Sequence, residues 1–169
     1  MLTRYQMFAG YNVWANERLY AAAASLSDAD YKADRGAFFK SVHGTLSHLL
    51  IADRIWMHRL SKRGETYARL DVILCENLPT LRAERQLEDQ RIAAYIGGLT
   101  EADLAARICY RTITNPAEIE QRLAPALDHF FNHQTHHRGQ VHALLTGLAG
   151  AAPSLDLLLY QRETGVGLK

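Results

Sequence analysis

The stretch RLAPALDHFFNHQTHHRGQVHALLTGLA, residues 122–149, has the pattern of one long amphipathic helix and holds five of the chain's eight histidines. With about 100° of rotation per residue, most of its large apolar side chains fall on one face. Pro125 is compatible with a helix only in its first turn, and Gly150 and Pro153 supply a stop signal. We therefore predict a helix over the whole stretch, with histidines on more than one face.

The rest of the chain predicts three more long helices. They cover residues 4–26, 41–62 and 80–98, with Ser41 and Thr80 as N-caps of the second and third. Each repeats apolar side chains at helical spacing and ends at glycine or at a polar turn. The chain is thus expected to be mostly helical.

Shorter segments complete the predicted architecture. Ser27 can cap a short turn after the first helix, and residues 154–163 are typical of a short terminal helix. The segment RICYRTIT, residues 107–114, is rich in β-branched and aromatic side chains, so we expect either a short strand or an extended crossover. Four amphipathic helices with one long crossover connection describe an all-α four-helix bundle. Without an internal repeat or a long linker, residues 1–169 are expected to form a single domain.

Composition excludes several classes of protein. The chain is 48% hydrophobic and 22% charged, and its 19 basic side chains nearly balance 18 acidic ones. With a formal charge of +1 and no basic stripe, a nucleic acid or an anionic membrane is not the expected partner. No apolar run reaches the roughly 18 residues of a membrane-spanning helix, and the N-terminus lacks the apolar core of an export signal. Two distant cysteines indicate no disulfide framework, so we expect a soluble cytoplasmic protein.

The angular positions of the histidines on the helix of residues 122–149 separate them into two groups. His137 lies about 40° from the centre of the apolar stripe and His133 about 80° from it. His129, His136 and His142 lie about 100° to 140° away, where solvent or a partner is expected. Side chains four residues apart on a helix can reach a common ion, so the inward pair is the better candidate for metal ligands.

Two imidazoles hold a divalent metal poorly, so a third ligand is expected from another helix. In the predicted helix of residues 41–62, Asp53 lies at the centre of the main apolar stripe and His48 lies on a second apolar flank. His43 and His58 group with polar residues on the remaining side. Helical geometry alone leaves both His48 and Asp53 open as the third ligand.

Other polar residues on apolar faces are expected to support the site or the core. Asn12, Gln134 and Arg138 fall in apolar stripes, as Asp53 does, so each needs a buried polar partner. Asp53 with Arg138 is predicted to form a buried ion pair. His129 stands one turn before the histidine pair, where it could orient a ligand or line a pocket.

With these residues identified, the chain resembles the DinB family of small bacterial four-helix proteins over nearly its whole length. The resemblance rests on four motifs: YNVWANERL, SVHGTLSHLLIADRIWMHRL, LEDQRIAAYIGGLTEADL, and FNHQTHHRGQVHALL followed by PSLDLLLY. It implies a divalent metal held by His48, His133 and His137, and so favours His48 over Asp53. It also implies a homodimer, which the two apolar sides of the second helix favour independently.

Three neutral imidazoles leave the charge of a divalent ion uncompensated, so an anionic fourth ligand is expected. Zinc or nickel is the first expectation and iron or manganese the second, because imidazole binds several of these metals. Activation of water would support hydrolysis, and activation of a low-molecular-weight thiol would support transfer to a small-molecule substrate. Some relatives in the wider superfamily resemble thiol S-transferases, which favours the thiol. The alternative is a non-catalytic, metal-binding stress-response dimer with a structural ion.

Overall fold

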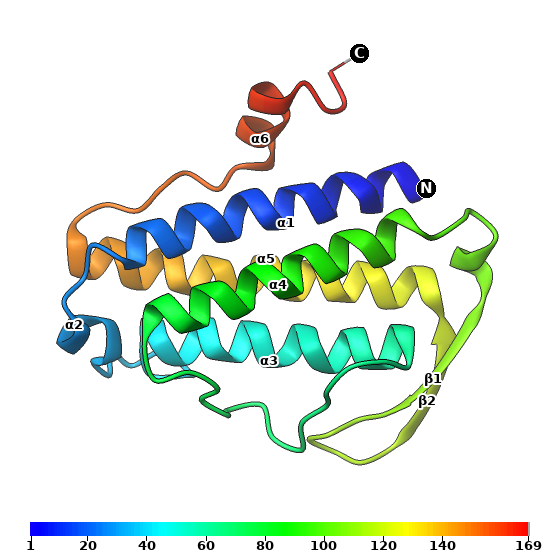
Figure 1. The fold of residues 1–169 in the computed structure, drawn as a ribbon, viewed down its shortest axis with the longest axis horizontal. Coiled ribbons are helices and arrows are strands. Elements are labelled where there is room, and N and C mark those ends of the chain that lie inside the picture. The colour runs from blue at the N-terminus through cyan, green and yellow to red at the C-terminus, as the bar shows by residue number, and fades with distance from the viewer. Residues whose placement is uncertain (169) are drawn as a thin grey trace.

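The computed structural model describes residues 1–168 of the chain. Four long helices form its core: α1 (Leu2–Ala23), α3 (Val42–Ser61), α4 (Leu78–Gly97) and α5 (Leu123–Ala149). Figure 1 shows them lying along one another, and α1 and α3 each pack against both α4 and α5. The prediction of an all-α four-helix bundle is confirmed, with a small β-hairpin added.

Of the two N-caps predicted for the long helices, one is confirmed. Ser41 is the N-cap of α3 and its hydroxyl accepts from the Gly44 amide at 3.0 Å, as predicted. The cap of α4 is Asn77 and not Thr80, since the Asn77 side chain accepts from the Thr80 amide at 3.0 Å. Pro79 fits this earlier start because the first turn of a helix does not need its missing N–H group.

One long crossover was predicted without a location, and residues 62–77 form it. Figure 1 shows that α3 and α4 run in the same direction, so the chain between them returns along the length of the bundle. Leu74 and Cys75 of this crossover pack against a core cluster that includes Leu46 and Leu49 of α3. The crossover therefore covers a flank of α3 that the other helices leave open.

This covering corrects two expectations for α3. Its second apolar flank is buried within one chain, with 15 of its 20 residues buried, so that flank gives no separate reason for a dimer. His43 was expected on a polar side but is also buried. Its ring stacks on Tyr31, with ring centroids 4.9 Å apart, and its Nε2 lies 2.8 Å from the Cys75 carbonyl oxygen.

A two-stranded antiparallel hairpin joins α4 to α5 after the short 3-10 helix η1 (Asp103–Ala105). Strand β1 (Arg107–Arg111) confirms the strand alternative for this segment, and it pairs with β2 (Glu118–Arg122). The second strand was not predicted, because its sequence EIEQR lacks the β-branched and aromatic run that identifies β1. The hairpin places the Tyr110 side chain beside Trp56 and Arg59 of α3.

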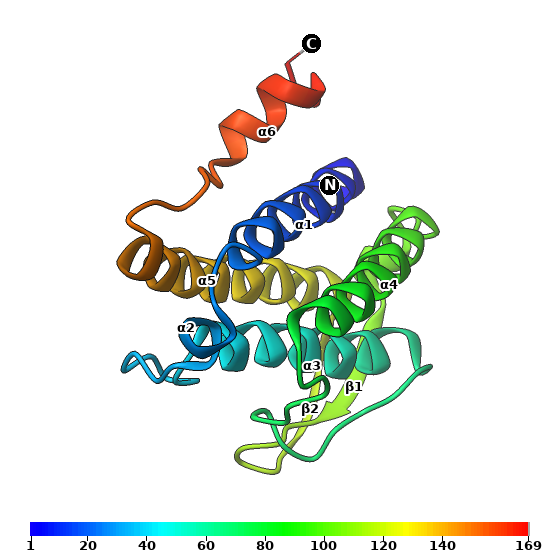
Figure 2. The ribbon, with the colours of Figure 1, turned by 60° about the vertical axis from the view of Figure 1, so that its left-hand side comes forward.

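Two short helices complete the structure. Ser27 caps α2 (Asp28–Lys32), as predicted, and α6 (Leu157–Thr164) is the predicted terminal helix. Figure 2 shows α6 outside the bundle beside α1, where Tyr160 packs edge-on against Tyr11 and Trp14. Neither α6 nor any other helix over residues 1–168 has the length and apolarity needed to cross a membrane.

The bundle core contains a buried polar network to which all four long helices contribute. Asp53 of α3 accepts from Arg85 of α4 at 2.6 Å and from Gln134 of α5 at 3.0 Å. Asp89 of α4 accepts from the Asn12 amide nitrogen of α1 at 2.9 Å. These side chains are at most 4% exposed, so their hydrogen bonds replace water that cannot reach them.

The predicted ion pair between Asp53 and Arg138 is wrong. Arg85 takes the place of Arg138 beside the carboxylate, while the Arg138 guanidinium donates to the Asn12 side-chain oxygen. Helical periodicity places a residue on a face but does not identify which of two buried arginines lies closer to the acid.

We predict that Asp53→Ala destabilises the fold by about 3–5 kcal/mol, because it leaves the buried Arg85 guanidinium without its shortest ion pair. Urea unfolding followed by circular dichroism measures the change. Asp71→Ala is the matched control, since it removes a carboxylate from an exposed pair with Arg69 and is expected to have no resolvable effect. A loss below about 1 kcal/mol for Asp53→Ala would contradict a dry ionic core.

Candidate metal centre

Three histidines from two helices converge at one point of the structure. His48 comes from α3, and His133 and His137 come from successive turns of α5. Their ligand nitrogens all lie within 4.8 Å of one another. The structure thus brings together the three histidines that the resemblance implied, and we call them the histidine trio.

Hydrogen bonds outside the trio orient two of its rings. The Nδ1 atom of His48 lies 2.9 Å from the Leu70 carbonyl oxygen, and that of His137 lies 2.8 Å from the Gln140 side-chain oxygen. The side-chain nitrogen of Gln140 lies 3.2 Å from His136 Nε2, which keeps the oxygen turned toward His137. The Leu70 and Gln140 oxygens are both hydrogen-bond acceptors. In the neutral rings, Nδ1 of His48 and Nδ1 of His137 therefore each carry the proton.

This tautomer leaves two unprotonated nitrogens facing each other. The Nε2 atoms of His48 and His137 are 3.2 Å apart, and in the neutral rings both point a lone pair into the trio. Two lone pairs at that distance repel each other unless a cation or a proton lies beside them. The donor set therefore fits a divalent metal ion, for which neutral imidazole is a common ligand.

The surroundings of the trio keep its rings neutral. Burial, together with the charges of the neighbouring histidines, lowers the pKa of His133 to about 3. Burial also lowers the pKa of His48 to about 4, and it lowers the pKa of His137. At neutral pH all three imidazoles are therefore in the unprotonated form that coordinates metals.

An aromatic side chain closes one side of the trio. The ring of Phe39 stacks on His48, with centroids 3.7 Å apart and planes 14° apart, and meets the edge of His137 at 5.6 Å. Phe39 lies in the loop before α3, next to Lys40, which has a positive φ of 68°. The position of Phe39 depends on that loop, and no helical pattern predicts it.

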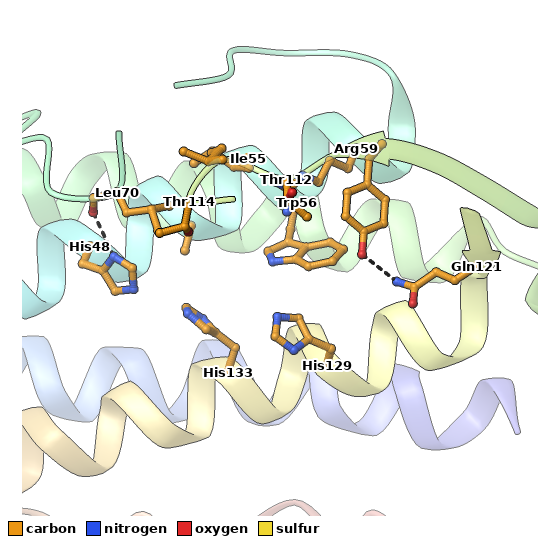
Figure 3. Close-up of a pocket in the computed structure, with 13 residues that line it drawn as sticks. His48, Ile55, Trp56, Arg59, Leu70, Thr112, Thr114, Gln121, His129 and His133 are labelled. Carbon is orange, nitrogen blue, oxygen red and sulfur yellow. Dashed lines mark hydrogen bonds between the residues drawn. The ribbon is translucent and has the colours of Figure 1, made fainter. Parts of the chain in front are cut away.

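On another side, His48 and His133 of the trio line a cavity of about 410 Å³, which is within the range for small-molecule sites. Figure 3 shows His48, His133 and His129 around this cavity, with Trp56 beside His129. The rings of Trp56 and His129 are 5.0 Å apart. A ligand in the cavity would therefore meet the trio at one end and an aromatic wall along its length.

The remaining predicted residues divide between the cavity and the core. His129 lines the cavity, and partial burial of its ring against the cavity wall lowers its pKa. Asn12, Asp53, Gln134 and Arg138 lie in the core network, and within residues 1–168 no hydrogen bond joins them to the trio. They support the helices that carry the trio.

Sequence reasoning missed several groups that shape the site and the core. Gln140 stands three residues after His137 on the same helix, so helical spacing could have identified it as a partner. Arg85 and Asp89 share a helical face with Leu81 and Ile92, so helical spacing could also have identified them as buried. The Leu70 carbonyl belongs to the crossover, and its position has no local sequence signal.

Comparisons with known proteins agree with this architecture. Protein DinB of Bacillus subtilis (strain 168) is 27% identical in an alignment 164 residues long, and the alignment covers 91% of this chain and 92% of that protein. A crystal structure of a DinB-like protein from Bacillus cereus ATCC 10987 matches with a TM-score of 0.63 and 17% identity. This match covers 87% of this chain and 94% of the other, and it supports the fold. The DinB family model matches residues 1–166, and the chain therefore belongs to the DinB family.

Proposed function

We propose that this protein is a divalent-metal-dependent enzyme that activates a small thiol or water. The observation that carries the proposal is the convergence of three neutral imidazoles, within 4.8 Å, beside a cavity of about 410 Å³. Three protein ligands with one open side are typical of catalytic metal sites, whereas structural sites are usually closed by four ligands. The cavity is therefore the reason to prefer an enzyme to a non-catalytic stress-response dimer.

His48, His133 and His137 would hold the ion, and zinc or nickel would suit three imidazoles better than iron or manganese. When bound, such an ion supplies Lewis acidity and lowers the pKa of a thiol or a water molecule. The Leu70 carbonyl and Gln140 keep the nitrogens of two of the rings turned inward. Partners of this kind typically change metal affinity by about 10-fold to 100-fold.

Other side chains of the cavity fit a role in binding and proton transfer. Trp56 and Ile55 give the cavity an apolar wall that excludes water from part of a bound molecule. His129 has no hydrogen-bond partner within residues 1–168, and its lowered pKa keeps it neutral, so its ring could accept the proton of a thiol or of water. The likeness of some wider relatives to thiol S-transferases favours a low-molecular-weight thiol over water.

We further propose a homodimer and a single domain. In support, a groove of about 380 Å³ between α1 and α5 is lined by the partly exposed Phe8 and by the buried Tyr5 and Phe131. Aromatic side chains are enriched at protein interfaces, and most soluble oligomers are symmetric dimers.

We predict that His48→Ala, His133→Ala and His137→Ala each lose most of the bound metal, because each removes one of three coordination bonds. His142→Ala is the matched control on α5 and is expected to keep full occupancy. His136→Ala removes no ligand and is also expected to keep the metal, with a small loss of affinity because it frees the Gln140 amide. His129→Ala is the intermediate case, with a loss of up to about 10-fold in affinity. Elemental analysis per chain of untagged protein, with circular dichroism as a folding check, measures the outcome.

The same variants test the activity. Metal-loaded protein is assayed for transfer of thiols to an electrophilic aryl halide and for hydrolysis of activated esters, with His133→Ala as the blank and His142→Ala as the active control. Full metal occupancy in His133→Ala, or equal turnover by the metal-free protein, would refute the proposed function. Metal binding without turnover of either substrate class would favour the non-catalytic alternative.

We predict that metal affinity survives moderate acidity. Three histidines with the usual pKa of about 6.5 would each lose about 10-fold at pH 5.5, or about 1000-fold together. Burial lowers the pKa of His48 to about 4 and of His133 to about 3, so at pH 5.5 protons compete only at His137. The expected loss between pH 7.5 and pH 5.5 is therefore at most about 10-fold. Competition with a zinc indicator at both pH values measures it, and a loss near 1000-fold would show that the rings titrate normally.

We predict that the protein is a dimer at about 10 µM in light scattering, where one chain would give 19.0 kDa. Phe8→Glu is expected to give monomers, because it places a charge in the groove between α1 and α5. Gln6→Glu adds a charge to an exposed side of the same helix and is expected to leave the dimer intact. A monomer mass for the unmodified chain would rule out the homodimer.

A further inference from the structure

The cavity beside the trio contains a cationic side chain whose charge is not matched. The guanidinium carbon of Arg59 lies 4.8 Å from the Trp56 ring centroid and 4.7 Å from that of Tyr110. One of its nitrogens donates to the Arg111 carbonyl oxygen at 3.0 Å. Within residues 1–168 no carboxylate oxygen lies within the 4.0 Å of an ion pair from Arg59. Two aromatic rings and a carbonyl thus hold the charge in place without neutralising it.

Two neighbouring arginines have the carboxylate partner that Arg59 lacks among the described residues. Arg54, also on α3, forms an ion pair with Glu84, and Arg91 of α4 pairs with Glu88. Arg59 is only partly exposed, and burial lowers its pKa, which shows that water solvates its charge incompletely. A partly buried cation without a counter-ion gains free energy when an anion binds beside it.

The rest of the cavity lining is compatible with an anion and contains no aspartate or glutamate. The Tyr110 hydroxyl accepts a hydrogen bond from Gln121 at 3.1 Å, a contact drawn in Figure 3, which leaves its own hydrogen available to a ligand. Thr114 contributes a further hydroxyl group. With a divalent ion on the trio, both ends of the cavity would carry positive charge.

We propose that Arg59 binds the carboxylate of a small molecule whose opposite end carries the group that reaches the histidine trio. The inference rests on the proposed function and specifies the ligand: an anionic molecule with a thiol or similar donor at one end and a carboxylate at the other. Trp56 lies between the two ends of the cavity and would cover the apolar middle of the molecule.

The separation of the two ends sets the length of this ligand. His48 and Arg59 lie on the same helix, and 11 residues at 1.5 Å each place their Cα atoms about 16 Å apart. Side chains on a helix lean toward its N-terminus, so the long Arg59 side chain extends toward His48 and shortens the gap. A chain of several carbon atoms between the two groups is therefore expected to bind better than a very short one.

The test uses cobalt(II)-loaded protein and thiols of increasing length: mercaptopropionate, mercaptohexanoate and mercaptooctanoate, each with its uncharged amide. Thiolate binding changes the visible absorption of cobalt, which gives a dissociation constant without any turnover. We expect the longer carboxylates to bind at least about 10-fold more tightly than their amides, the size of a charge-assisted hydrogen bond. Arg59→Gln is expected to abolish that preference, and Arg59→Lys to retain part of it.

Lys62→Asn is the matched control, because it removes a positive charge one turn from Arg59, on an exposed residue outside the cavity lining. Asparagine tolerates the positive φ of 57° at that position. The preference for carboxylates should survive in this variant. If it falls equally in Arg59→Gln and Lys62→Asn, general electrostatic attraction and not a site at Arg59 explains the binding.

The outcomes separate the two proposals. An absence of cobalt bands would refute the proposed metal site, and the Arg59 site is then tested on metal-free protein by calorimetry with hexanoate against hexanamide. Cobalt and thiol binding with no preference for the carboxylate, or with the preference intact in folded Arg59→Gln, would overturn the inference and leave the metal site standing. If Arg59→Gln does not fold, the unmodified chain and Arg59→Lys decide in the same way.

Discussion

The hydrogen bond from Gln134 to Asp53 fixes how α3 lies against α5, and the candidate site depends on that alignment. Asp53 is held from the other side by Arg85, so the carboxylate joins α3, α4 and α5 in the buried core. Gln134 directly follows His133 in the chain. When its amide meets Asp53, His133 and the next turn of α5 are brought opposite His48. A register shift of one residue would separate the trio and leave buried polar groups unpaired.

Helix α5 serves the core and the site with adjacent residues. His133 and His137 turn toward the crossover side, while Gln134 and Arg138, each about 100° further around the helix, turn toward the core network. The network therefore also restrains the histidine ligands, because Gln134 and Arg138 lie in the same backbone turns as His133 and His137. Small changes in the core would displace the ligand nitrogens of the trio, and metal coordination tolerates little displacement.

Much of the fold and part of the site could be predicted from the sequence, and the limits have physical reasons. Periodicity and capping identified the four helices, and the angular count picked His133 and His137 because both lie on one helix. His48 could not be separated from Asp53 by that count, since the choice depends on how two helices face each other. The strand β2, the Leu70 carbonyl and the partner of Asp53 depend on contacts distant in sequence, which local patterns do not encode.

The crossover of residues 62–77 has a thermodynamic consequence beyond its role as a cover. The Leu70 carbonyl holds the His48 ring, so the ring is oriented for coordination only while this part of the crossover lies against α3. Any ion that prefers the oriented ring must then also favour the closed crossover, and by reciprocity a closed crossover must raise the affinity for the ion. Ion binding and the ordering of this surface segment would thus be thermodynamically coupled, although the segment contributes no ligand of its own.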